Sequence, residues 1–148
     1  MTASRQQGAA QTHPHLFAKV AAQRCVDCGI PLTTGEGFEV PFIGTLGPKC
    51  VKKYAALVAV LEQVDGLEAH EYDQGSIRLA HHVIWKLRGC GIAVKVLDIA
   101  ADTKRVQIMG LSKKPLAVIK SYAEIRAQFE RQLQIAQVER EAAEAAAS

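Results

Sequence analysis

Three of the four cysteines stand at spacings that suit a metal ion better than a hydrophobic core. Cys25 and Cys28 form a C-x-x-C pair, and Cys50 follows Gly47 and Pro48. A C-x-x-C turn aims two sulfur atoms at one point, which is the arrangement that tetrahedral zinc requires. We expect Cys50 to begin a helix, where the partial positive charge of the helix terminus favours a thiolate. The spacing therefore predicts a structural zinc site.

The segment 25–54 resembles the small three-cysteine zinc modules of treble-clef type that occur in phage and bacterial proteins. The resemblance is carried by Cys25, Cys28, Gly29, Leu32, Gly47, Pro48 and Cys50. It covers about a fifth of the chain. It implies a metal-supported module of the kind attached to proteins that handle nucleic acid.

A structural zinc site needs a fourth ligand, but the positions three and four residues after Cys50 hold Lys53 and Tyr54. Cys90 completes the predicted set of Cys25, Cys28, Cys50 and Cys90, because its glycine neighbours leave it sterically accessible. Water and five histidines remain alternatives: His13, His15, His70, His81 and His82. A thiol-redox role is disfavoured, because a turn at 29–31 replaces the helix that redox chemistry requires.

Composition and length are those of a globular protein, with 148 residues, 49% of them hydrophobic and 22% charged. We expect a cytoplasmic protein without membrane contact, because no apolar run is long enough to span a bilayer and residues 1–12 lack a signal-peptide core. In a reducing compartment four cysteines are typical of metal ligands or thiols rather than disulfides. No phosphate-binding loop, catalytic triad or carboxylate pair is present, so no enzymatic activity is predicted.

Charge is unevenly distributed along the chain, although the net value is only +3. Basic zones alternate with acidic ones, and the former suit phosphate contacts. The residues predicted to bind nucleic acid are Lys49, Lys52, Lys53, Trp85, Lys104, Arg105, Lys113 and Lys114. Trp85 shares its segment with Arg78, Lys86 and Arg88, a combination that suits base stacking. The alternative is a solvated basic surface with Trp85 half-buried by packing.

Periodicity and turn residues predict the elements that position these groups. We expect a flexible N-terminal segment with a short helix or turn at 16–21, and an edge strand at 38–43. Apolar residues at helical spacing predict a helix at 51–64 and, after an exposed connection at 67–74, a second helix capped by Ser76 and stopped at 89–91. Alternation predicts a β-hairpin with strands at 92–98 and 105–109.

A long helix is predicted from about residue 116. Its apolar stripe consists of Val118, Tyr122, Ile125, Phe129, Leu133 and Ala136. We expect the stripe to pack on the same chain, with a protein partner or self-association through residues 116–137 as the alternative. Residues 138–148 form an Ala/Glu-rich tail.

These features together predict an α+β fold, in which an N-terminal treble-clef-like metal module precedes a helix, a β-hairpin and a long C-terminal helix. The expected parts are a flexible segment at 1–22, the zinc-knuckle module with its helix at 23–65, a helix, hairpin and long-helix unit at 66–137, and the tail at 138–148. The predicted function is non-catalytic zinc-dependent binding of DNA or RNA in a phage-like or bacterial transaction. The alternative is a protein-interaction adaptor or oligomer that uses the long helix.

Overall fold

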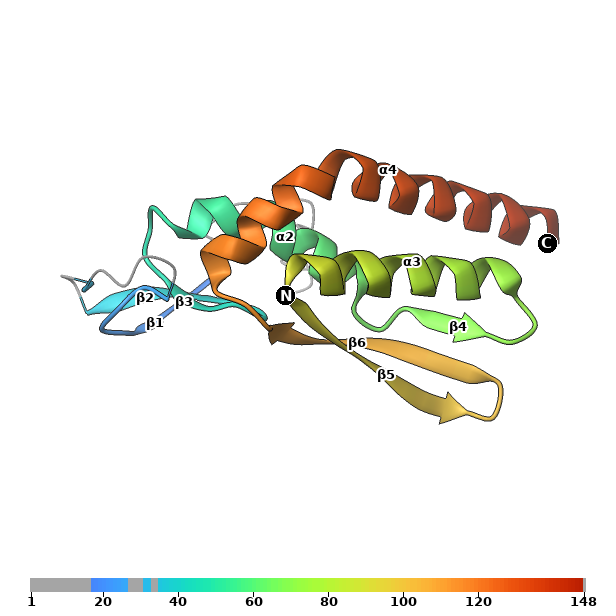
Figure 1. Cartoon of the computed structure of the whole chain (residues 1–148), viewed down its shortest axis with the longest axis horizontal. Helices are drawn as coiled ribbons and strands as arrows, with labels where there is room; N and C mark the ends of the chain where they lie inside the picture. The colour runs from blue at the N-terminus through green and yellow to red at the C-terminus, as the bar shows by residue number, and fades with distance from the viewer. Residues whose placement is uncertain (1–16, 27–30, 33–34, 148) are drawn as a thin grey trace.

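The chain adopts an α+β fold in the computed structural model, which describes residues 17–26, 31–32 and 35–147 (Figure 1). The strands form two antiparallel three-stranded sheets, with the orders β1-β2-β3 and β4-β6-β5. The elements are β1 (Ala18–Ala21), β2 (Glu36–Val40), β3 (Gly44–Leu46), α2 (Val51–Val64), β4 (Glu68–His70), α3 (Gln74–Cys90), β5 (Ile92–Ala100), β6 (Thr103–Leu111) and α4 (Pro115–Ala147).

The N-terminal sheet differs from the sequence-based prediction in two respects. The segment predicted as a helix or turn at 16–21 contains strand β1, which pairs with β2 from Ala18 opposite Glu39 to Ala21 opposite Glu36. The predicted edge strand is in fact the central strand β2, which ends at Val40. Pro41 lies in the turn just after it, where its missing N–H costs no ladder hydrogen bond.

Helix α2 has the predicted bounds, and the chain then turns directly into the second sheet. Gly66 takes a left-handed φ of 89°, and its N–H donates to the carbonyl of Val106 at 2.8 Å. The segment predicted as an exposed connection at 67–74 contains β4, a half-buried strand paired with β6. The prediction was wrong here because three residues are too few for an alternation to be recognised.

Helix α3 is capped by Asp73 rather than by Ser76. The Asp73 carboxylate accepts a hydrogen bond from the Ser76 N–H at 3.2 Å, so the helix begins two residues before the predicted cap. Gly91 ends it with a left-handed φ of 97°. The hairpin that follows is confirmed, with β5 and β6 each nine residues long.

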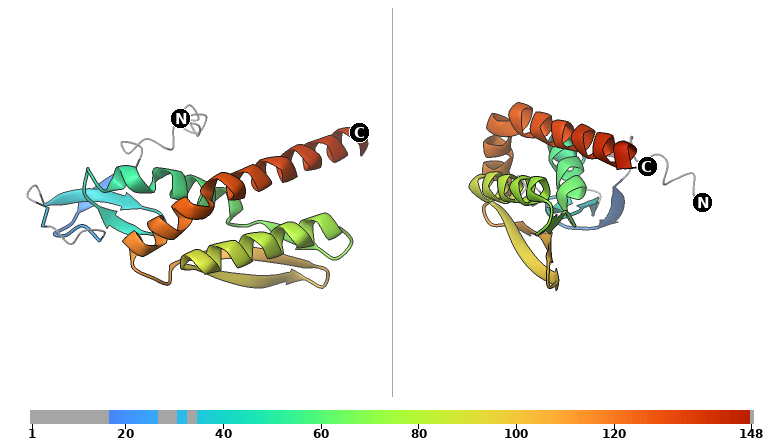
Figure 2. Two further views of the ribbon diagram at one scale, coloured as in Figure 1. Left: turned by 45° about the horizontal axis from the view of Figure 1, so that its top comes forward. Right: turned by 90° about the vertical axis from the view of Figure 1, so that its right-hand side faces the viewer.

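Helix α4 packs along α2 and α3, so the predicted intramolecular packing of its stripe is confirmed. Its buried residues are Val118, Tyr122, Phe129 and Leu133. Figure 2 shows its C-terminal half diverging from α3, and the predicted tail continues as helix to Ala147. Among the helices of the described residues, none is long and apolar enough to cross a membrane.

One hydrophobic core contains residues from both halves of the chain. The sheet β1-β2-β3 contributes to it on one side of α2, and the hairpin, α3 and α4 contribute on the other. Its members include Cys25, Leu46, Val51, Tyr54, Leu61, Leu87, Ile92, Ile108, Tyr122 and Phe129. The core therefore holds the cysteine-bearing segment in a fixed relation to α2.

Candidate metal centre and nucleic-acid interface

The C-x-x-C turn is flanked by paired backbone. Arg24 and Pro31 form an antiparallel bridge, and the Leu32 N–H donates to the carbonyl of Gln23 at 2.8 Å. The two arms of the turn are thus tied together on either side of the cysteines. Cys28 itself lies outside the described residues.

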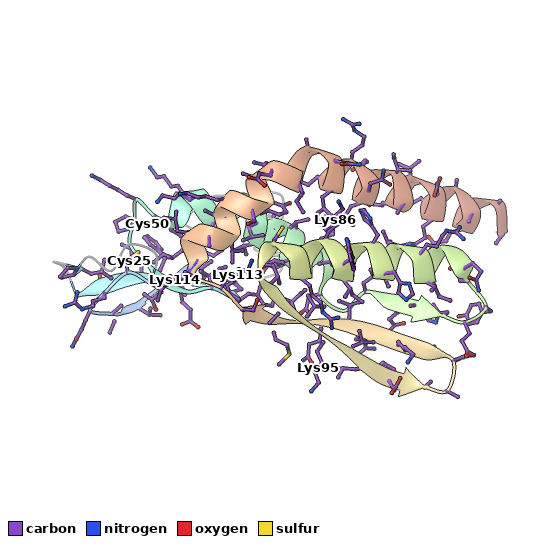
Figure 3. All side chains as sticks on the ribbon, in the orientation of Figure 1. Cys25, Cys50, Lys86, Lys95, Lys113 and Lys114 are labelled. Atoms are coloured by element: carbon purple, nitrogen blue, oxygen red, sulfur yellow. The ribbon has the colours of Figure 1, made fainter. Side chains whose placement is uncertain are left out.

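Cys25 and Cys50 lie at the same end of the molecule (Figure 3). Cys50 directly precedes α2, as predicted, and the hydrogen bond from Val51 N–H to the Gly47 carbonyl closes its turn at 2.9 Å. A Cβ on Gly47 would lie 3.9 Å from the Cβ of Cys25, so this turn and the first cysteine are in close approach. Both cysteines are buried, and neither is in a disulfide with another described residue.

The donor set fits a metal ion. Cys25 and Cys50 come from separate segments at the same end of the molecule. Cys50 directly precedes a helix N-terminus, where thiolate is favoured, and the C-x-x-C spacing would supply a third sulfur. Within the described ranges no group of three or more His, Cys, Asp or Glu side chains is placed to hold a metal. Of the predicted set, Cys25 and Cys50 lie at the same end of the molecule, while Cys28 falls outside the described part of the chain.

Cys90, the predicted fourth ligand, belongs to a different part of the core. It ends α3, and burial raises the pKa of its thiol, an effect that nearby Lys113 and Lys86 oppose. His70 is also engaged elsewhere, since its Nδ1 lies 3.0 Å from the Thr103 hydroxyl. The structure does not bring either residue into a cluster with Cys25 and Cys50. His13 and His15 lie outside the described residues.

Two of the predicted phosphate-binding residues are neutralised by carboxylates. Lys104 Nζ lies 3.2 Å from Asp98 Oδ1 across the hairpin. Arg105 contacts Glu68 Oε2 through Nη2 at 2.8 Å and through Nε at 3.3 Å. The arrangement ties β4 and β5 to β6. Sequence spacing gave no sign of the Arg105–Glu68 pair, because its partners are 37 residues apart along the chain. These two cations therefore offer little charge to a polyanion.

The other predicted lysines remain on the surface in two groups. Lys113 and Lys114 lie where the chain passes from β6 to α4, near the end of α3 (Figure 3). The stem of Lys113 packs against the backbone at Gly91, since a Cβ there would lie 2.9 Å from the Lys113 Cδ. Lys49, Lys52 and Lys53 are exposed beside Cys50 at the start of α2.

Trp85 is not half-buried: 78% of its surface is exposed on the outer side of α3. Helix α3 also carries Arg78, Lys86 and Arg88, two histidines and no carboxylate in its 17 residues. Helical spacing places Arg78, His81, Trp85 and Arg88 along one side. Lys95, which sequence reasoning missed, is exposed on the neighbouring strand β5. Lys95 is a charged residue in an alternating apolar strand, and this pattern could have predicted its exposure.

Comparison of the chain with models of known protein families, with curated proteins and with solved structures finds no match.

Proposed function

We propose that this chain is a non-catalytic nucleic-acid-binding protein, with a structural zinc site of treble-clef type in its first 65 residues. The observation that carries the binding proposal is the outer face of α3, where an exposed indole stands among cations on a helix without a single carboxylate. Polyanions with aromatic bases match that combination of groups. Lys113 and Lys114 extend the positive surface beyond the end of α3.

Zinc is the cofactor proposed for the cysteine site. Cys25, Cys28 and Cys50 would hold it, and the fourth position would be filled by His13, His15 or water. The metal would stabilise the turn and fix it against α2, as closed zinc sites do in small modules. This role is structural and requires no reaction at the metal.

Elemental analysis of protein purified under reducing conditions without chelator tests the zinc site. We expect about one zinc per chain. Cys28→Ser and Cys50→Ser should each lose the metal, because a structural site needs all of its thiolates. Cys90→Ser is the matched control and should retain it. Metal-free wild-type protein would contradict the proposal. Loss of zinc from the Cys90 variant would show that Cys90 is the fourth ligand.

Fluorescence anisotropy with labelled oligonucleotides tests the binding proposal. Affinity should fall as salt rises, because bound phosphates release counterions. Replacing Lys95, Lys113 and Lys114 by Ala should flatten the logarithmic salt dependence by about 0.7 for each phosphate that the variant no longer neutralises. A charge-matched control replaces Lys19, Arg131 and Arg140, which lie on other elements, and should keep most of the slope. Absence of binding to any DNA or RNA at low salt would refute the function.

A second candidate, the protein-interaction adaptor, is favoured by one observation. Ile135 and Val138 are 43% and 52% exposed on the outer side of α4. The same part of the helix borders a groove of about 660 Å³ between α2, α3 and α4. This surface is small and mixed with charged residues, so it supports a partner less strongly than α3 supports a polyanion.

A further inference from the structure

The geometry points to single-stranded nucleic acid as the ligand, held by stacking of an unpaired base on Trp85. This inference rests on the proposed function and narrows its ligand class.

Trp85, like Tyr72, is an aromatic residue with most of its surface in water, unlike the aromatic residues of the core. Tyr54, Tyr122 and Phe129 are each at most 2% exposed, whereas the indole of Trp85 stands in water. An aromatic ring in water gains hydrophobic free energy when a flat apolar partner covers its face. The faces of nucleic-acid bases are such partners.

Arg88 fixes the position of β5 relative to the part of α3 that carries Trp85. The Arg88 Nη2 donates to the carbonyl of Val94 at 2.8 Å, and so ties the last turn of α3 to β5. Strand β5 returns from Gly91 beneath the end of α3 and diverges from the helix toward the hairpin tip (Figure 1). Trp85 precedes Arg88 by about one helical turn, and one or two strand residues span the same length. Trp85 is therefore expected to lie beside the residues that follow Val94 by one or two positions. Trp85 thus stands level with Lys95 and the partly exposed Val96.

The charged side chains around Trp85 favour one direction for a bound polyanion. Lys86, Lys95, Lys113 and Lys114 surround the C-terminal half of α3 and have no ion-pair partner among the residues that the structure describes. At the N-terminal end the surface is acidic, with Glu71, Asp73 and Asp102 around the hairpin tip. A bound polyanion is therefore expected to extend from Trp85 toward Lys113 and Lys114. The acidic side chains near the start of α3 would repel it in the opposite direction.

The shape around α3 disfavours a duplex. In a duplex the base faces are stacked inside, and proteins reach only the base edges in the grooves. A recognition helix must enter a major groove about 12 Å wide, and a helix with its side chains nearly fills that width. Helix α3 is flanked by α4 and by the β5–β6 hairpin, so the combined surface is too broad to enter. An unpaired base has both faces available to the indole.

Trp85 is the only tryptophan in the chain, so its fluorescence reports on the site directly. The probes are a thymidine oligonucleotide, a uridine oligonucleotide of the same length, a blunt DNA hairpin and poly-L-glutamate. We expect the two single strands to quench the fluorescence, because a base stacks on the indole, and the hairpin and the polypeptide to leave it nearly unchanged. The relative response to thymidine and uridine measures the DNA or RNA preference.

Trp85→Ala should weaken single-strand binding, measured by anisotropy, by about tenfold. Trp85→Phe should retain part of the affinity because it keeps an aromatic plane. Tyr72→Ala is the matched control: Tyr72 is also exposed, but it stacks on His70 at the acidic end, with 5.1 Å between the ring centroids. Its removal should leave the affinity unchanged.

The alternatives give distinct outcomes. If the hairpin binds as tightly as the single strands and the Trp85 variants bind normally, the single-strand inference is overturned while nucleic-acid binding stands. Quenching by poly-L-glutamate equal to that by oligonucleotides would overturn it in favour of an acidic peptide. No binding of any oligonucleotide would remove the proposed function together with the inference.

Discussion

His82 packs against α4 in an environment that should make the stability of the protein depend on pH. The ring of His82 stacks on Phe129 with 5.9 Å between centroids, and its Nε2 is buried without a hydrogen-bond partner in the described part of the chain. Tyr122, in the same contact region, donates its hydroxyl to Glu130 at 2.7 Å. Burial, followed by the positive charge of Lys86, lowers the pKa of His82 from 6.5.

This environment predicts a loss of stability in mild acid. Because the folded-state pKa of His82 lies below 6.5, the unfolded chain binds more protons than the folded protein as pH falls below that value. The contribution is fully present above that value and is lost as pH falls through the lower folded pKa. His82→Gln should therefore lose less of its unfolding free energy than wild type between about pH 7.5 and pH 5.5.

The measurement is the urea midpoint of each protein at the two pH values. His81→Gln is the control, because His81 is the exposed neighbour on α3. It should follow wild type. Equal acid sensitivity in the His82 variant and in wild type would assign the pH dependence to other groups.

At the scale of elements, the sequence predicts long periodic segments and misses short ones. Helices α2 and α4 and the β5–β6 hairpin have apolar patterns sustained over several turns or residue pairs, so their existence follows from periodicity. Strands β1 and β4 have four and three residues, and tertiary pairing with β2 and β6 alone makes them strands. Pairing of this kind has no local signal in the chain.

The candidate sites divide in the same way. Local spacing was sufficient to place Cys50 directly before α2. Spacing could not show that Lys104 and Arg105 are paired with acids, or that Cys90 lies in another part of the core. The exposure of Trp85 was also beyond the sequence, because it depends on which side of α3 faces α4 and the hairpin.

At the scale of the molecule, α4 holds the two halves of the fold together. It contacts both α2, which starts at the cysteine site, and α3, which carries the Trp85 face. Figure 1 shows it crossing α2 and then running beside α3. The relative position of the two candidate sites therefore depends on the buried stripe of α4, and a partner bound to its outer face would leave that stripe in place.

Phe129→Ala tests this role of α4 and the oligomer alternative in one experiment. Phe129 is almost fully buried against His82 and Tyr122, so the substitution should cost about 3 kcal/mol of unfolding free energy. Ile135→Ala, on the exposed side of the same helix, is the control and should change stability by less than about 0.5 kcal/mol. Because the stripe packs within the chain, sedimentation should give a monomer for wild type and for both variants. A concentration-dependent dimer that Ile135→Ala dissociates would instead identify the outer face of α4 as an interface and favour the adaptor.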